Sequence, residues 1–378
     1  MNVYGSTSLH EFLGDRVVYR SLNSVDDRLP GLQDLRGKAG IEAHQTPRKG
    51  QPAYARVIVP LLEAARRLQR RNGILKRLLY VGDTRRNDGR AFRTIARTGG
   101  WPGVAFIGGE NQEPPSFQLL ENEEENQVLY LANRWAALHD LDAFCRDRNF
   151  PLDQETAVIL DLDKTCLGAR GRNDQIINQA RVEAVRLTVD SLLGEAFDRD
   201  RFQETYQLWN QPVFHAFTGD NQDYLAYICL MLGSDVFDTE TVVQAVEEGE
   251  MKTFQQFIRQ VDEQEDRLST GLREVHNRLY ERVRAHDPTP FKAFRRREYT
   301  STVSRMGILD DSASPEEMLG GEIVITSEVR EAALRWRGRG ALLFGLSDKP
   351  DEASLPPEDL SARGFKPIHR VETHIVGE

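Results

Sequence analysis

Two aspartates that follow an apolar run are the residues of this chain best suited to chemistry. Residues 157–165 read AVILDLDKT, so Asp161 and Asp163 come directly after four apolar residues. Such a run predicts a strand buried on both faces, and side chains two apart on an extended chain point the same way. Two carboxylates in one small space need a cation between them. An oxygen-rich site of this kind favours Mg²⁺ together with a phosphate.

Two further segments repeat the pattern of an apolar run that ends in polar residues. Residues 78–88 read LLYVGDTRRND, with Asp83 and Asp88 in the turn, and residues 322–328 read EIVITSE. Glycine and aspartate are common in turns, and many strands end in Thr-Ser, so each segment alone is also compatible with an ordinary loop. All three together favour phosphate chemistry.

These segments resemble the signature motifs of the haloacid dehalogenase (HAD) superfamily of phosphatases and phosphotransferases. The resemblance implies that Asp161 is the nucleophile that accepts the phosphoryl group, and that Asp163 protonates the leaving oxygen and then activates water. It also implies a Mg²⁺ site formed by Asp161, Asp163 and Asp83, with Asp88 holding the loop or a metal-bound water.

The resemblance further implies groups that bind the phosphoryl oxygens. Thr326 is the first candidate for the hydroxyl that donates a hydrogen bond to the phosphate, and Ser327 is the second. Arg170 and Arg172 follow the nucleophile strand in the segment GARGRN, where either guanidinium could lie over a phosphate.

Two lysines are candidates for the cation that neutralises the phosphorylated aspartate. Lys49 stands in TPRKG before a predicted helix, and Lys349 stands in SDKPD directly after a predicted strand at residues 341–346. The place of Lys49 along the chain, before a helix and then the Asp83 strand, favours Lys49. The Lys-Pro pattern directly after a strand favours Lys349. Asp348 and Asp351 on either side of Lys349 could also mimic a metal motif in place of Asp83.

The order of the motifs along the chain differs from the family's order. The segment with Asp83 normally comes last, but here it precedes Asp161 by about eighty residues. The order is restored if the chain is read as a circle, which predicts one circularly permuted, three-layer α/β core with a parallel, Rossmann-like sheet. In this core we expect the strand before Asp83 to lie beside the strand that ends at Asp161 and the Thr326 strand to lie on its other side, all three parallel. Permutation of this kind requires exposed termini that lie close together. The alternative is two incomplete halves, each with too few strands to close a core.

A long helical insert separates Asp161 from the Thr326 segment. We expect helices at residues 175–193 and 223–232 and one long amphipathic helix over residues 254–283, besides the helix at 53–68 before the Asp83 strand. HAD enzymes carry a helical cap at this place, which excludes water from the substrate. We therefore expect an α/β core of residues 1–168 and 321–378 and a helical cap of residues 169–320, with a separate interaction module as the alternative reading of the insert.

Composition narrows the classes of function. The 378 residues carry a net charge of −10, which argues against a general binder of nucleic acid or anionic membranes. No run of eighteen apolar residues or signal-peptide pattern occurs, and three cysteines match neither a zinc site nor a disulfide framework, so we expect a cytoplasmic protein.

The sequence therefore predicts a Mg²⁺-dependent phosphatase that hydrolyses a phosphomonoester of a small molecule. Two alternatives remain at this point: a phosphomutase or phosphotransferase of the same superfamily, and a HAD-derived binding protein without turnover. Neither the substrate nor the oligomeric state follows from the sequence.

Overall fold

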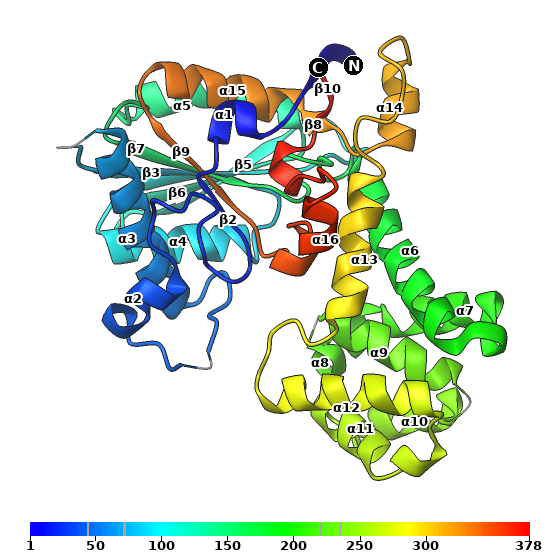
Figure 1. Cartoon of the computed structure of the whole chain (residues 1–378). Coiled ribbons are helices and arrows are strands. Elements are labelled where there is room, and N and C mark those ends of the chain that lie inside the picture. Colours follow the sequence, from blue (N-terminus) through cyan, green and yellow to red (C-terminus); the bar gives the residue numbers. More distant parts are fainter. Residues whose placement is uncertain (44, 71–72, 220, 235) are drawn as a thin grey trace. The chain divides into compact units, whose positions relative to one another are not determined.

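The computed structural model describes residues 1–43, 45–70, 73–219, 221–234 and 236–378 (Figure 1). They form two compact units, the first made of Met1–Gln179 and Thr302–Glu378 and the second of Ala180–Ser301. Both boundaries lie within helices, α6 (Asp174–Leu193) and α13 (Lys292–Val303). The second unit thus begins later and ends earlier than the helical insert expected over residues 169–320.

The first unit is built on a seven-stranded, mostly parallel sheet. Its strand order is β2-β9-β7-β3-β4-β6-β5, and the edge strand β5 is antiparallel to β6 while every other neighbouring pair is parallel. The central strands β7 and β3 are mostly apolar and almost fully buried, as expected for strands covered on both faces. The strands are β2 (Val17–Val18), β3 (Arg77–Gly82), β4 (Gly103–Gly108), β5 (Phe117–Asn122), β6 (Gln127–Ala132), β7 (Thr156–Asp161) and β9 (Leu342–Leu346).

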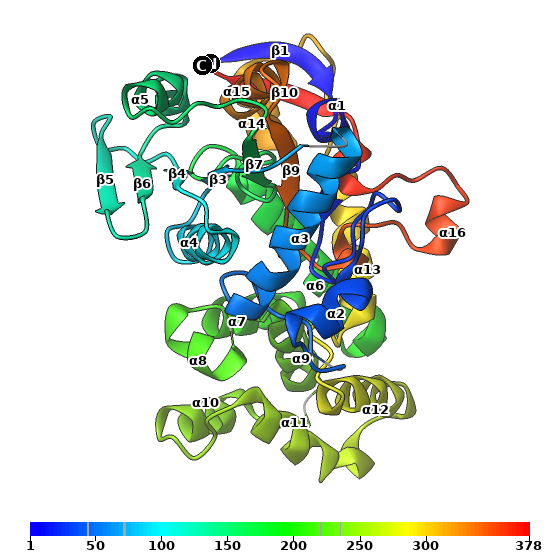
Figure 2. The same ribbon diagram turned by 90° about the vertical axis from the view of Figure 1, so that its left-hand side faces the viewer.

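Helices cover both faces of this sheet, so the first unit is an α/β protein. Helices α3 and α4 lie on one face and α5 and α15 on the other (Figures 1 and 2). Helix α3 starts with a proline at its first position, where the missing N–H costs nothing, and matches the helix expected at residues 53–68. The helices of this unit are α1 (His10–Leu13), α2 (Leu32–Ala39), α3 (Pro52–Gln69), α4 (Asp88–Gly99), α5 (Leu141–Asp147), α14 (Pro315–Gly321), α15 (Ser327–Gly338) and α16 (Glu358–Ser361).

Strand order confirms one expectation about the sheet and corrects another. Strand β3, which leads to Asp83, lies parallel and adjacent to β7, which ends at Asp161. The expectation that the Thr326 strand lies on the other side of β7 is wrong, because β9 occupies that place. Thr326 belongs to a two-residue strand, β8 (Ile325–Thr326), in a separate sheet. The apolar run before Thr326 is too short to show whether its strand pairs with β7 or with β10 in the separate sheet.

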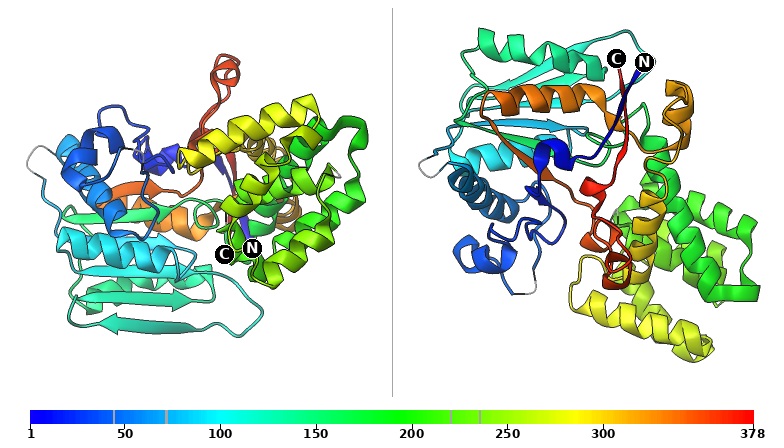
Figure 3. Two further views of the ribbon diagram at one scale, coloured as in Figure 1. Left: turned by 90° about the horizontal axis from the view of Figure 1, so that it is seen from below. Right: turned by 45° about the horizontal axis from the view of Figure 1, so that its top comes forward.

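The second sheet of this unit joins the two ends of the described chain. Its order is β1-β10-β8, with β1 (Asn2–Thr7) antiparallel to β10 (Thr373–Gly377), so Asn2 pairs with Gly377. Figure 3 shows the N- and C-termini side by side in both views. This proximity is the structural condition for a permuted arrangement of strands.

The second unit consists of helices around an apolar core. Helix α9 is apolar on nearly all sides and is buried, as its sequence predicts. The expected single helix over residues 254–283 is wrong: the stripe is divided between α11 and α12, because Ser269 caps the amide of Leu272 and starts a new helix. The remaining helices are α7 (Arg199–Trp209), α8 (His215–Thr218), α9 (Gln222–Gly233), α10 (Thr239–Glu247), α11 (Phe254–Asp262) and α12 (Thr270–Arg284).

Across the described part of the chain, no helix has both the length and the apolar character needed to span a membrane.

Candidate active site

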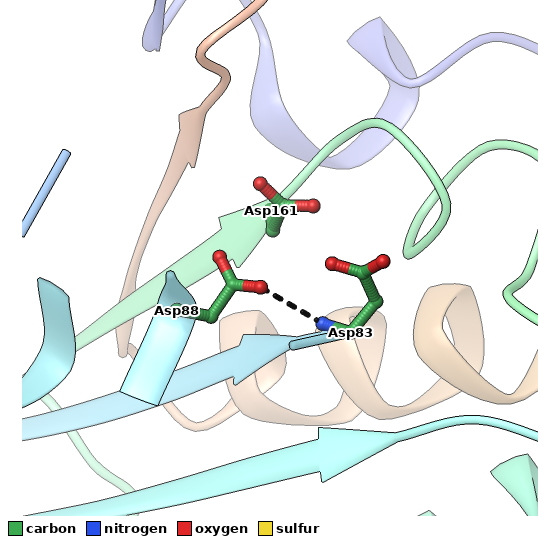
Figure 4. A group of neighbouring side chains, drawn as sticks. All are labelled: Asp83, Asp88 and Asp161. Atoms are coloured by element: carbon green, nitrogen blue, oxygen red, sulfur yellow. Dashed lines mark hydrogen bonds between the residues drawn. The ribbon is translucent and has the colours of Figure 1, made fainter. Parts of the chain in front are cut away.

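Three carboxylates converge at the carboxyl ends of β3 and β7. Asp161 is the last residue of β7, Asp83 directly follows β3, and Asp88 is the first residue of α4. One oxygen of each lies within 4.8 Å of the others, and Figure 4 shows the three side chains facing one space. Parallel strands bring residues far apart in the sequence to the same edge of the sheet, where ligands of open α/β sheets bind.

Asp88 holds the turn that carries Asp83. Its Oδ2 accepts hydrogen bonds from the backbone amides of Asp83 and Thr84, at 3.2 and 2.9 Å, and from the Thr84 hydroxyl at 2.9 Å. Its Oδ1 accepts from the Tyr80 hydroxyl at 3.1 Å. A Cβ atom at Gly82 would lie 2.6 Å from the Asp88 side chain, so this packing requires glycine. These bonds give Asp88 a positioning role.

Lys49 connects Asp88 to Asp161. Its Nζ lies 2.5 Å from Asp88 Oδ1 and 2.5 Å from Asp161 Oδ1, and its side chain is buried. Burial opposes the charge of the ammonium, but the two carboxylates raise the pKa of Lys49 well above its ordinary value. Lys49 is therefore a permanent positive charge against the candidate nucleophile.

The loop after β7 folds back on itself and fixes the carboxylate of Asp161. The Thr165 hydroxyl donates to Asp161 Oδ2 at 3.1 Å, and the amide of Cys166 donates to the Asp161 carbonyl at 3.3 Å. Lys164 has a φ of +63°, which is uncommon outside glycine, and its amide donates to the carbonyl of Leu167 at 2.7 Å. Residues 161–165 thus form a tight turn, and Thr165 orients the carboxylate of Asp161.

Burial and like charge set the protonation of the three carboxylates. Burial, together with the nearby charge of Asp88, raises the pKa of Asp83 to about 7. Burial also raises the pKa of Asp161, although Lys49 opposes this shift. Burial acts in the same direction on Asp88, but Lys49 and its hydrogen bonds hold the pKa of that carboxyl below its ordinary value. Of the three carboxyl groups, Asp88 is therefore the one that ionises most readily.

Asp163 and Lys349 form a second pair beside this cluster. Lys349 Nζ lies 3.5 Å from Asp163 Oδ2, and the lysine side chain is buried whereas the carboxylate is partly exposed. Asp163 is not among the three converging carboxylates. The two candidate lysines are thus divided by geometry: Lys49 contacts Asp161, and Lys349 contacts Asp163.

The two candidate arginines have different surroundings. Arg170 Nε lies 2.6 Å from Asp83 Oδ2, and its side chain is partly exposed, which places this guanidinium at the edge of the cluster. Arg172 is buried between Glu110 and Glu328, with ion pairs of 2.5 and 2.9 Å. A guanidinium held by two carboxylates is already neutralised. The structure brings Arg170, and not Arg172, to the three aspartates.

Thr326 and Ser327 do not reach the carboxylates directly. The Thr326 hydroxyl donates to the carbonyl of Thr165 at 2.5 Å, and its amide donates to the carbonyl of Cys166 at 2.9 Å. Ser327 begins α15, and its hydroxyl donates to Glu331 at 3.4 Å. Thr326 thus supports the loop that carries Asp161.

Asp348 and Asp351 do not replace Asp83. Asp348 lies 3.5 Å from Arg20, and both oxygens of Asp351 accept hydrogen bonds from Ser21. Of the described acidic residues, Asp83 and Asp88 are the ones grouped with Asp161.

Sequence reasoning missed two hydroxyl groups near the cluster. Ser347 is buried and follows Leu346, the residue of β9 that pairs with Asp161 of β7, and adjacent strands are about 4.8 Å apart. The apolar run before Ser347 is the signal that could have identified it.

The Tyr54 hydroxyl is buried without a hydrogen-bond partner among the described residues. Burial raises the pKa of Tyr54, and the charges of Asp348, Lys49 and Asp161 act on it. No sequence pattern marks this tyrosine.

The residues at this site fit a magnesium ion. The donors are carboxylate oxygens, which hard divalent cations prefer, and neither cysteine nor histidine is among them. When all three carboxylates are ionised they face two cations, Lys49 and Arg170, so one negative charge remains for a metal ion to balance. Asp161 and Asp83 would hold the ion, since Asp88 already accepts several hydrogen bonds.

Comparisons of the chain with models of protein families, with curated proteins and with solved structures found no match. The fold and the site define an α/β protein with a carboxylate and lysine cluster at the carboxyl ends of its central parallel strands.

Proposed function

We propose that this protein is a Mg²⁺-dependent phosphatase of the HAD type, which hydrolyses a small phosphomonoester through a phosphorylated aspartate. The observation that carries the proposal is the convergence of Asp161, Asp83 and Lys49 at the ends of two adjacent parallel strands. A buried carboxylate beside a permanent cation suits a nucleophile that must take up a phosphoryl group.

Each step of the reaction is assigned to residues of this chain. Asp161 forms a bond from a carboxylate oxygen to phosphorus while the ester bond to the leaving group breaks, and Asp163 gives its proton to the leaving oxygen. Asp163 then takes a proton from water, which attacks the phosphorylated Asp161 and releases phosphate. Lys49 stays against Asp161 and balances the charge that develops on the phosphoryl oxygens. A bound Mg²⁺ would offset the like charges and polarise the phosphoryl group.

Ser347 is the better candidate for the hydroxyl that binds a phosphoryl oxygen. The resemblance assigned this role to Thr326, whose hydroxyl already donates to the carbonyl of Thr165. Ser347 stands next to the register partner of Asp161 on the neighbouring strand.

We also propose that the helical unit of residues 180–301 is the cap that contributes specificity groups and excludes water.

The proposal is tested by incubation of the purified full chain with Mg²⁺ and a generic aryl phosphate. We expect release of inorganic phosphate that depends on the metal and stops when a chelator is added. A screen of phosphorylated metabolites then ranks natural substrates by kcat/KM. Transfer of the phosphoryl group to a sugar hydroxyl without release of phosphate would indicate a phosphotransferase instead. Absence of phosphate release from every compound would reject an active phosphatase.

The affinity for Mg²⁺ should increase from about pH 6 to about pH 8. Because the pKa of Asp83 is raised to about 7, the carboxyl loses its proton over this range, and metal binding requires the carboxylate. Without metal, the free energy of unfolding should change with pH in the opposite direction. The stability that protonated Asp83 contributes is present at low pH and is lost as the pH rises through about 7. Calorimetric titration with Mg²⁺ and thermal melts at several pH values measure both effects.

Asp83→Asn is the variant that attributes this pH dependence. The asparagine side chain stays neutral at every pH. The Mg²⁺ affinity of the variant should therefore be lower than that of the unchanged protein at each pH, and it should vary much less with pH around pH 7. Asp351→Asn is a matched control, since this aspartate is likewise partly buried but is bound to Ser21. An unaltered metal titration in Asp83→Asn would remove Asp83 from the metal site.

A further inference from the structure

We infer that the first unit contains a binding pocket for the leaving group of the phosphomonoester, and that this leaving group carries a planar heteroaromatic ring, as in a nucleoside monophosphate. The inference rests on the proposed phosphatase function and specifies its class of substrate. It depends on a cavity beside the carboxylate cluster, on an aromatic surface in that cavity and on the polar groups around it.

The cavity adjoins the candidate active site. It has a volume of about 440 Å³, within the range of pockets that bind small molecules, and Asp83 and Arg170 are among its lining residues. Asp83 is also one of the three converging carboxylates, and Arg170 is its ion-pair partner. The other lining residues come from the turn after β3, from the ends of β4 and β6 with the loop after β4, and from the start of β5, so the cavity lies entirely within the first unit. A ligand whose phosphate reaches Asp161 can extend its leaving group past Arg170 into this cavity.

Phe117 supplies a flat aromatic surface in the cavity. One face of its ring stacks on Tyr130, with the ring centroids 4.9 Å apart and an interplanar angle of 16°. The other face is open, because the residue is 60% exposed although it is a large apolar side chain. Tyr130 in turn packs against Phe106 and Phe144, which prevents the pair from collapsing inward. A rigid ring with one open face is suited to stack on a second planar ring.

Polar groups around Phe117 indicate a ring with hydrogen-bonding edges. Gln118 and Ser116 line the cavity on either side of Phe117 in the sequence. Asn133 accepts a hydrogen bond from the amide of Ser116 at 2.7 Å, which fixes the start of β5 and therefore the position of Phe117. Ser116 and Gln118 are exposed and can hydrogen-bond to a ligand, and a nucleobase offers donors and acceptors around a planar ring.

The charge of the cavity favours a single nucleotide. Its acidic residues are paired, Asp83 with Arg170 and Glu110 with the buried Arg172, and Arg85 adds a further cation to the lining. One phosphate at the carboxylate cluster and a neutral base against Phe117 match this distribution. The net charge of the whole chain, −10, opposes binding of a long polyanion.

The test compares nucleotide and aliphatic substrates in variants of Phe117. For the full chain with Mg²⁺, we measure kcat/KM for adenosine monophosphate and for glycerol phosphate, and we take their ratio. Phe117→Ala should lower this ratio roughly 5- to 100-fold, because stacking with the base is lost. Phe117→Trp should restore it. Ile74→Ala, which removes an equally exposed apolar side chain outside the cavity, should leave the ratio unchanged.

Binding measurements separate this inference from the proposed function. We titrate adenosine monophosphate into the Asp161→Asn protein by calorimetry, with and without Phe117→Ala. Binding that weakens with Phe117→Ala supports the pocket even if no variant releases phosphate, in which case only the phosphatase function fails. Release of phosphate from glycerol phosphate, combined with a ratio and a nucleotide affinity that do not depend on Phe117, overturns the pocket and leaves the function intact. A change of oligomeric state in Phe117→Ala with an unchanged ratio would also overturn it, since Phe117 would then belong to an interface.

Discussion

Asp161→Asn should lower phosphate release roughly 10⁴-fold or more, because a carboxamide has no anionic oxygen that can attack phosphorus. The variant should remain folded: asparagine has nearly the same volume, and Lys49 keeps Asp88 as its partner at 2.5 Å. Initial rates with the best phosphomonoester and thermal melts measure the two properties. Asp153→Asn is the matched control, since this residue precedes the amino end of the same strand and pairs with Arg77 at 2.6 Å.

Asp163→Asn distinguishes the role of Asp163 from that of Asp161. Loss of a general acid and base should cost roughly 10²- to 10⁴-fold in rate. Because the nucleophile remains, phosphorylated protein should accumulate and be detected by mass spectrometry in Asp163→Asn but not in Asp161→Asn. Activity close to that of the unchanged protein in Asp161→Asn, or a phosphate on another residue, would refute the assignment of the nucleophile.

Lys49→Ala should lower kcat roughly 10²- to 10³-fold, whereas Lys349→Ala should lower it about tenfold or less. Lys49 contacts Asp161 at 2.5 Å in a buried site, but Lys349 contacts the partly exposed Asp163 at 3.5 Å. Initial rates at saturating substrate and Mg²⁺ measure the difference. Equal losses in the two variants would mean that contact with Asp161 does not select the lysine.

The Lys49 variants should also lose stability, which requires a control. Without Lys49 the two carboxylates of Asp88 and Asp161 lack their buried counter-charge, and breaking a buried pair in this way costs roughly 3–5 kcal/mol. Lys49→Met keeps the aliphatic part of the side chain and removes only the charge, so it separates packing from electrostatics. Rates are compared below the melting temperature of each variant, measured by thermal unfolding, so that loss of fold is not counted as loss of catalysis.

Local patterns in the sequence were sufficient to predict the elements that carry the candidate site. The strands before Asp83 and Asp161 are continuous apolar runs, and the helices expected at residues 53–68, 175–193 and 223–232 match α3, α6 and α9. The length of an apolar stripe was less informative at residues 254–283. There the cap formed by Ser269 divides the stripe into two helices, because a local hydrogen bond can end one helix and start another without a change in hydrophobic pattern.

The sequence by itself determined that acidic residues follow two apolar strands, and hence that carboxylates would meet if those strands were neighbours. Only the tertiary structure decided the partners of these carboxylates. Lys49 reaches Asp161 and Lys349 reaches Asp163, β9 with Ser347 takes the place expected for Thr326, and Arg172 is used in a buried ion pair. The physical reason is that strand order and side-chain contact are set by pairing between segments more than a hundred residues apart, which no local periodicity encodes.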